Sequence, residues 1–198
     1  MRGQRIGPIS CRTALWAVLA GMILATGCVF EPRIPSDPSE VTVGWIRPIE
    51  PENVLFNIKA GIDAEYSTNY SNSLHADFTY VPSAGNVEEA PDGYFDDWDA
   101  ERELAALDKL FLQVDSLRVE WNFDPNEDLT ESGDEAIAEL ENYQLFASYS
   151  GSEQVVYEGY ARLILRYENS QWQLYQWDES DNGSLQSWGR LRANLQIP

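Results

Sequence analysis

The residue types that carry most protein chemistry are scarce in this chain. His75 is its single histidine, and Cys11 and Cys28 are its two cysteines. One chain therefore cannot build a zinc site from several His or Cys ligands. His75 could serve in a catalytic triad, but no GxSxG sequence supplies a nucleophile. A histidine between a helix and a strand is more often simply exposed. The sequence also contains no Gly-rich phosphate-binding loop. The sequence predicts no catalytic, cofactor-binding or metal-binding residues.

An acidic loop at residues 124–135, DPNEDLTESGDE, has the spacing of a calcium-binding loop. Oxygen-bearing side chains stand at positions 1, 3, 5, 7, 9 and 12, namely Asp124, Asn126, Asp128, Thr130, Ser132 and Glu135. Position six holds Leu129, where the sharp turn of such a loop needs glycine, and strand-like patterns flank it. Such spacing arises easily in an acidic chain, so a solvated hairpin loop is favoured over calcium binding.

Cys28 has a different chemistry because of the residues before it. The first twelve residues carry three arginines and no acid, and residues 13–27 carry no charge and end in small residues. This is the pattern of a secretory signal. The sequence ATGC at residues 25–28 resembles the lipobox of bacterial lipoproteins, which implies cleavage before Cys28 and acylation of its sulfur. The alternatives are simple secretion or an uncleaved anchor over residues 13–30, which are at the lower limit of a spanning length.

The cysteine count supports acylation. Without the leader, Cys28 is the only thiol, so no internal disulfide can form. Acylation with palmitate-type chains would both block this thiol and anchor the chain in a lipid bilayer. Val29, rather than Asp, follows the cysteine, which in lipoproteins favours the outer membrane. We therefore expect a bacterial cell-envelope protein that is lipid-anchored in the outer membrane and faces the periplasm.

The charge is strongly negative. The residues from 28 onward contain 33 acidic and 10 basic side chains, a formal charge of −23. Such a field repels nucleic acids, so we expect no nucleic-acid partner. Aromatic residues make up 12% of the chain and include seven Trp, which is not typical of a disordered polypeptide. The sequence indicates an acidic surface over a packed core.

Three segments follow from these patterns. Residues 1–27 are the expected lipoprotein signal peptide. Residues 28–48 form a Pro-rich tether, because prolines concentrate there and keep the chain extended. Residues 49–198 amount to about 150 residues, the size of one domain.

Within the domain, periodicity predicts helices first and strands later. Helical spacing covers residues 51–66 and 98–113, the second helix capped by Asp96 or Asp97, with a short strand at 74–82 between them. A polar turn is expected at residues 67–73, and a loop between the strand and the second helix. Four strands follow at residues 117–123, 136–150, 154–167 and 171–179. In the last strand the alternation skips from Leu174 to Tyr175, which predicts a bulge. Residues 184–195 have helical spacing again.

This α+β order resembles the NTF2-like family, which includes ketosteroid isomerase-like and SnoaL-like proteins. The carriers are LHADFTYVP at residues 74–82, the helix that opens with Trp98 and Glu101, and the closing hairpin at residues 159–179. The resemblance implies a cone, a curved antiparallel sheet wrapped around N-terminal helices. A lipocalin-like barrel is the alternative fold. The family's general-base carboxylate would fall at Val81 or Pro82, which cannot accept a proton, so the isomerase chemistry does not carry over.

Aromatic residues are the remaining candidates for a binding site. Five of them are expected on one side of the curved sheet, where they either fill the core or line a pocket for an apolar small molecule: Trp121, Tyr143, Tyr157, Trp172 and Trp177. The sequence thus favours a non-catalytic module that binds such a ligand or an envelope protein. The alternative is a small NTF2-like enzyme, an isomerase, cyclase or hydrolase.

Overall fold

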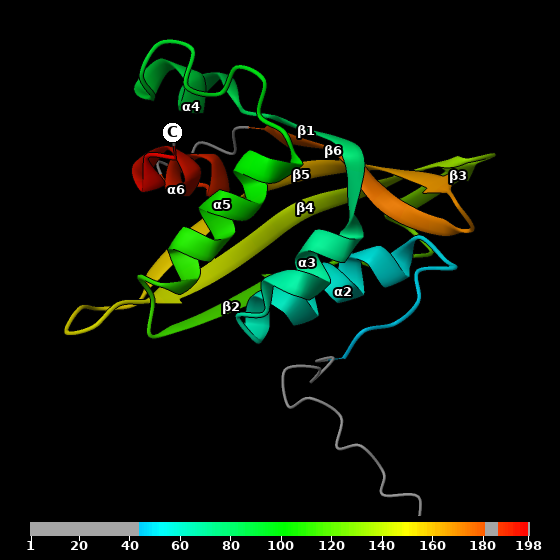
Figure 1. Ribbon diagram of the computed structural model, residues 1–198, viewed down its shortest axis with the longest axis horizontal. Coiled ribbons are helices and arrows are strands. Elements are labelled where there is room, and N and C mark those ends of the chain that lie inside the picture. The colour runs from blue at the N-terminus through cyan, green and yellow to red at the C-terminus, as the bar shows by residue number, and fades with distance from the viewer. Residues whose placement is uncertain (1–43, 181–185, 198) are drawn as a thin grey trace, which may run out of the picture. The chain divides into compact units, whose positions relative to one another are not determined.

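The computed structural model describes residues 44–180 and 186–197, which form one curved sheet with helices along one face (Figure 1). The predicted signal peptide and most of the predicted tether, including Cys28, lie outside the described residues. The sheet has the order β1-β6-β5-β4-β2, and β3 pairs with β4. Its strands are β1 (Leu74–Val81), β2 (Ser116–Trp121), β3 (Leu129–Ser132), β4 (Glu135–Ser148), β5 (Val155–Glu168) and β6 (Gln171–Ser180).

The sheet is mixed rather than purely antiparallel. Each of β2, β3 and β5 pairs antiparallel with β4, and β5 pairs antiparallel with β6, but β1 runs parallel to β6. Alternation within a strand does not reveal the direction of a neighbour that is remote in sequence, which is why the sequence missed this pair. The predicted bulge in β6 is confirmed, because Ile164 pairs with Gln176 while Leu165 pairs with Leu174.

The helices differ more from the prediction than the strands do. They are α2 (Glu52–Asp63), α3 (Ser67–Ser73), α4 (Ala84–Glu89), α5 (Ala100–Phe111) and α6 (Trp188–Leu195). Residues 67–73 form α3 instead of the expected turn, and α4 interrupts the expected loop. The cap of α5 is Asp99, whose carboxylate accepts the backbone N–H of Arg102 at 2.9 Å, rather than Asp96 or Asp97.

The core lies between the concave face of the sheet and the helices. Alternate residues of β4 and β5 point inward, so that Leu145 and Leu163, among others, are fully buried. The apolar stripes of α2 and α5 meet them, with Ile58 and Leu110 buried on the sheet side. None of the helices in the described residues is long and apolar enough to cross a membrane.

Candidate functional site

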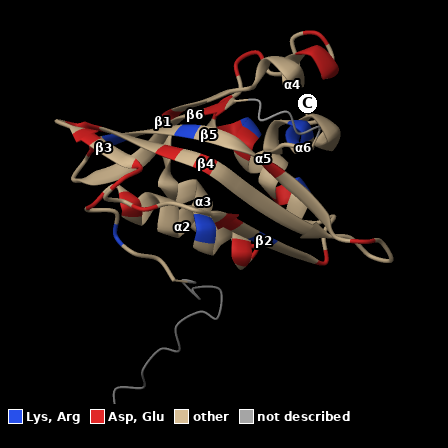
Figure 2. Cartoon of the chain, turned by 180° about the vertical axis from the view of Figure 1, so that it is seen from behind, with Lys and Arg blue, Asp and Glu red and all other residues tan. Residues whose placement is uncertain are grey.

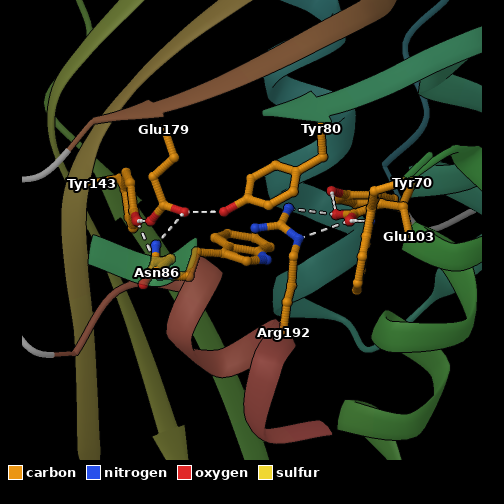
Figure 3. Close-up of polar contacts among 9 residues, drawn as sticks. Tyr70, Tyr80, Asn86, Glu103, Tyr143, Glu179 and Arg192 are labelled. Atoms are coloured by element: carbon orange, nitrogen blue, oxygen red, sulfur yellow. Dashed lines mark hydrogen bonds and ion pairs between the residues drawn. The ribbon is translucent and has the colours of Figure 1, made fainter. Parts of the chain in front are cut away.

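The interior of the cone contains a buried ion pair between α5 and α6 (Figure 3). Arg192 of α6 donates to both carboxylate oxygens of Glu103, from Nη2 to Oε1 at 2.6 Å and from Nε to Oε2 at 2.8 Å. The same carboxylate accepts the hydroxyl of Tyr70 at 2.6 Å and the indole N–H of Trp98 at 2.9 Å. The donors to Glu103 therefore come from α3, from α6 and from Trp98, which directly precedes the cap of α5.

Burial sets the electrostatics of this pair. Removal from water alone would raise the pKa of Glu103, but the Arg192 guanidinium and the Tyr70 and Trp98 donors hold that pKa below its usual value. Burial lowers the proton affinity of an arginine, yet the Glu103 carboxylate keeps the pKa of Arg192 above its usual value. Burial, and then the charge of Glu103, raises the pKa of Tyr70. The ion pair is thus charged, and Tyr70 stays a neutral donor.

A second carboxylate, Glu179 of β6, lies in the same interior. It accepts the Tyr80 hydroxyl and, at 3.2 Å, the Asn86 amide on one oxygen, and the Tyr143 hydroxyl on the other. Burial, and then the charge of Glu179, raises the pKa of both tyrosines, so each remains a neutral donor. The donors come from β1, α4 and β4, and therefore Glu179 joins three elements that are remote in sequence.

The start of α6 closes this second cluster. The backbone N–H of Trp188 donates to the Tyr143 hydroxyl at 3.0 Å, and Ser187 donates to the Asn86 amide oxygen at 3.0 Å. Gly189 sits so close that an added Cβ would overlap Asn86, Tyr80 and the Glu179 carboxylate. Only glycine lets the α6 backbone approach the carboxylate this closely.

Arg192 links the two clusters. Its guanidinium carbon lies 4.1 Å from the Tyr80 ring centroid, and the rings of Trp188 and Trp177 follow at 5.1 and 5.3 Å. These distances suit cation–π attraction, which is strongest for a desolvated cation. We call the combined set the interior network: Tyr70, Tyr80, Asn86, Trp98, Glu103, Tyr143, Trp177, Glu179, Trp188 and Arg192.

The interior network leaves little free space beside α5 and α6. Between α5 and α6 the remaining cavity measures about 10 Å³, enough for about one water molecule. A larger hollow of about 500 Å³ is open to the surface over β4 and β5, where Glu139, Tyr160 and Arg162 are among its lining residues. No member of the interior network lines that hollow.

Two of the five predicted pocket aromatics belong to the interior network. Tyr143 and Trp177 are fully buried, and the Trp177 ring packs 4.9 Å from that of Trp188. The other three lie elsewhere: Tyr157 is buried with its hydroxyl 3.3 Å from that of Tyr149, Trp172 is buried against Tyr167, and Trp121 is partly exposed beside a surface hollow.

Sequence reasoning missed the three charged members of the network, although two of them, Glu103 and Arg192, carry a signal. Glu103 precedes Ala106, Leu107 and Leu110 at the spacing of one helix face, and all four are buried. Arg192 stands likewise on the buried face of α6. A single charge on an apolar helix face, with an opposite charge on another such face, indicates a buried pair.

His75 is buried, contrary to the exposure that the sequence suggested. Its Nδ1 accepts the backbone N–H of Asp77 at 3.0 Å, so Nε2 carries the proton and donates to Glu168 at 2.9 Å. Both ring nitrogens are therefore occupied, and His75 holds β1 against the end of β5.

The acidic loop folds as a turn followed by a strand. Residues 129–132 are strand β3, and within the loop Asp124 accepts both nitrogens of Asn126, while Asp128 accepts the Asp124 backbone N–H. Over residues 44–180 and 186–197, no three His, Cys, Asp or Glu side chains group so that they could hold a metal ion.

Comparison with known proteins places the fold. No protein-family model matches the sequence, and no curated protein matches it either. Among solved structures, a protein from Kribbella flavida is 14% identical, with a TM-score of 0.55 over 72% of this chain and 94% of that one. A conserved protein from Planctomyces limnophilus is 17% identical, with a TM-score of 0.54 over 65% and 91% of the two chains.

A third solved structure also has a similar fold. A candidate scytalone dehydratase from Novosphingobium aromaticivorans is 11% identical, with a TM-score of 0.52 over 65% of this chain and 78% of that one. At such low identities the likeness concerns the fold alone. It confirms the predicted α+β, NTF2-like cone, with one parallel strand pair in its sheet.

Proposed function

We propose that this protein is a membrane-anchored cell-envelope lipoprotein whose NTF2-like domain is a non-catalytic binding module for a ligand or a protein partner. The observation that carries the proposal is the filled interior. α6 inserts Arg192 between Glu103 and Tyr80, and only about 10 Å³ stays free between α5 and α6. A binding role then falls to the outer surface.

The chemistry of the interior supports the same proposal. General acid–base catalysis needs a titratable group within hydrogen-bond reach of a bound substrate. Here Glu103 accepts bonds from Arg192, Tyr70 and Trp98, and Glu179 accepts three donors of its own. These contacts leave the two carboxylates engaged with the protein itself.

The anchor is part of the proposal and rests on the sequence before Cys28. Acylation there would place the domain in the bacterial envelope, on the periplasmic side of the outer membrane. The test is growth with labelled palmitate of cells that express the wild type, Cys28→Ala or Cys11→Ala. We expect label in the wild type and in Cys11→Ala only, and equal labelling of Cys28→Ala would overturn the anchor.

The filled interior is tested by native mass spectrometry of the full acylated chain, extracted in detergent. We expect the mass of the chain with its acyl groups and no further component. A small molecule retained at one per chain would contradict the filled interior, and would favour the alternative function.

That alternative is a small NTF2-like enzyme, an isomerase, cyclase or hydrolase that acts on an apolar small molecule. One observation favours it: Glu179 and the Tyr80 and Tyr143 hydroxyls combine a carboxylate with two proton donors inside the cone. Such an enzyme would require α6 to leave, since α6 covers this cluster.

A further inference from the structure

Three large apolar side chains are exposed within residues 44–56, at the start of the described chain. Ile46, Ile49 and Phe56 have 41%, 58% and 46% of their surface exposed. They lie on the segment 44–50 and on the outer side of α2, along which that segment runs. We call these three side chains the α2 apolar surface. Leu112, another exposed apolar side chain, follows the end of α5.

The α2 apolar surface is held in place by hydrogen bonds. The Asn57 side chain accepts the backbone N–H of Ile46 at 2.8 Å and donates to the Ile46 carbonyl at 2.6 Å. Two residues further, the Pro48 carbonyl accepts the backbone N–H of Trp172 at 2.7 Å. The segment is thus fixed to α2 on one side and β6 on the other. These bonds hold the segment in a position that leaves its apolar side chains exposed.

The position of this surface in the chain indicates what covers it. Gly44 follows Cys28 by 16 residues. In a polyproline conformation, 16 residues would span about 50 Å. An acyl anchor on Cys28 would therefore keep the α2 apolar surface at a high effective concentration next to the bilayer. Even a weak contact between this surface and the bilayer would then form.

We propose that the α2 apolar surface rests on the bilayer that holds the anchor, and so fixes which side of the domain faces the membrane. This inference rests on the acylation of Cys28 proposed above. Arg47 is exposed between Ile46 and Ile49 and can meet a headgroup phosphate. Glu50 and the partly exposed Glu52 also lie here, so the contact suits zwitterionic rather than anionic lipid.

A second copy of the chain fits the surface less well. Stable protein interfaces use about 20–30 residues a side, far more than three side chains and their neighbours. Each chain also carries a formal charge of −23 from residue 28 onward, which opposes association of copies. A bilayer contact needs neither a large area nor a complementary charge, because the anchor supplies most of the attachment.

The test uses the full acylated chain in vesicles of phosphatidylcholine and phosphatidylethanolamine that contain a lipid with a photoreactive group on its acyl chain. After flotation and illumination, mass spectrometry locates the labelled residues. We expect label on residues 44–60 at least tenfold above that on residues 104–121. The second segment carries Leu112, which is 87% exposed and serves as the internal control.

Variants sharpen the test. Ile46→Ser, Ile49→Ser and Phe56→Ser together should reduce the label on residues 44–60 at least fivefold without stopping flotation, whereas Leu112→Ser should change neither. Vesicles in which half of the lipid is anionic should also reduce the label.

The outcomes separate this inference from the proposed function. A chain that floats with the vesicles but is labelled equally on both segments overturns the bilayer contact and leaves the lipoprotein intact. A chain that does not float overturns both. A Cys28→Ala chain that forms a dimer in light scattering, and loses it on the triple substitution, would assign the surface to a second copy instead.

Discussion

Arg192 and Glu103 depend on each other because both are almost completely buried. Breaking a buried pair leaves one charge without compensation and costs about 3–5 kcal/mol of stability. We predict this loss for Arg192→Met, measured as the free energy of unfolding in urea. Adding Glu103→Gln to that variant removes the orphan charge and should recover part of the loss.

The control is a pair at the surface. Arg118 and Glu120 form an exposed ion pair on β2, and exposed pairs contribute about 0–1 kcal/mol. Arg118→Met should therefore change the free energy of unfolding by less than about 1 kcal/mol. If Arg192→Met were equally mild, the guanidinium would not hold the interior together.

The ionisable groups of the interior also predict how stability depends on pH. The pKa of Glu103 is lower in the folded chain than its ordinary value of about 4.3. Its contribution is complete above that value and is lost as the pH falls through the folded pKa, because the unfolded chain takes up the proton first. We expect the urea concentration at the unfolding midpoint to decrease when the pH is lowered below about 4. The decrease should be smaller in the Arg192→Met, Glu103→Gln double variant.

The buried tyrosines affect the stability at high pH. The pKa values of Tyr70, Tyr80 and Tyr143 are raised above their ordinary value of about 10. Above about pH 10 only the unfolded chain releases these protons, so stability falls as the pH rises. The part of the tyrosinate absorbance at 295 nm that comes from these three residues should appear together with unfolding, and Tyr143→Phe should soften the alkaline decline. Tyrosinate absorbance from all three in the folded chain would contradict this.

At the scale of elements, Gly189 decides how closely α6 docks. Helix propensity alone makes Gly→Ala stabilising by about 1 kcal/mol. At this position the new methyl would overlap Tyr80, Asn86 and Glu179, and overpacking costs about 1–3 kcal/mol. We therefore predict that Gly189→Ala lowers the thermal midpoint, although propensity predicts the opposite sign.

Ala193→Gly is the matched control on the same helix. It lowers helix propensity by about 1 kcal/mol and places no atom against the Glu179 cluster. If Ala193→Gly proved more destabilising than Gly189→Ala, the helix itself and not its close approach would limit stability.

Elements with strong periodicity could be predicted from the sequence, because side-chain alternation reports burial directly. β4 and β5 are long enough to show it, and the skip at Tyr175 revealed the bulge in β6. α3 escaped prediction because STNYSNS has no apolar stripe, and tertiary contacts of Tyr70 rather than propensity hold it.

The interior network could be predicted only in part. The aromatics Tyr143 and Trp177 were expected on the inner side of the sheet, since alternation places them there. The pairing of Glu103 with Arg192 joins residues 89 positions apart, and local patterns can mark each residue as buried but cannot show which residue it contacts. The parallel pairing of β1 with β6 is hidden for the same reason.

For the whole molecule, charge is the dominant property. Acidic residues, red in Figure 2, occur on most elements of the described part, with few Lys and Arg between them. Repulsion among them opposes the compact state, and salt screens it, since the Debye length falls from about 30 Å at 0.01 M to about 3 Å at 1 M. We predict that the urea midpoint rises when NaCl is increased from 0.02 to 0.5 M.

Neutral variants test the cause of that rise. Asp92→Asn, Glu131→Gln and Glu153→Gln remove three exposed acids from separate loops and strands. Together they should raise the midpoint at low salt and reduce its salt dependence. An unchanged salt dependence would mean that ions act through something other than surface repulsion.

The position of α6 in the chain has a consequence for biogenesis. Every partner of Arg192 in the interior network, from Tyr70 to Trp188, precedes it, so Glu103 is synthesised 89 residues before the cation that pairs with it. The core cannot be completed during synthesis until α6 is delivered. A product cut short before Arg192 would therefore be an incomplete fold that is open to proteases.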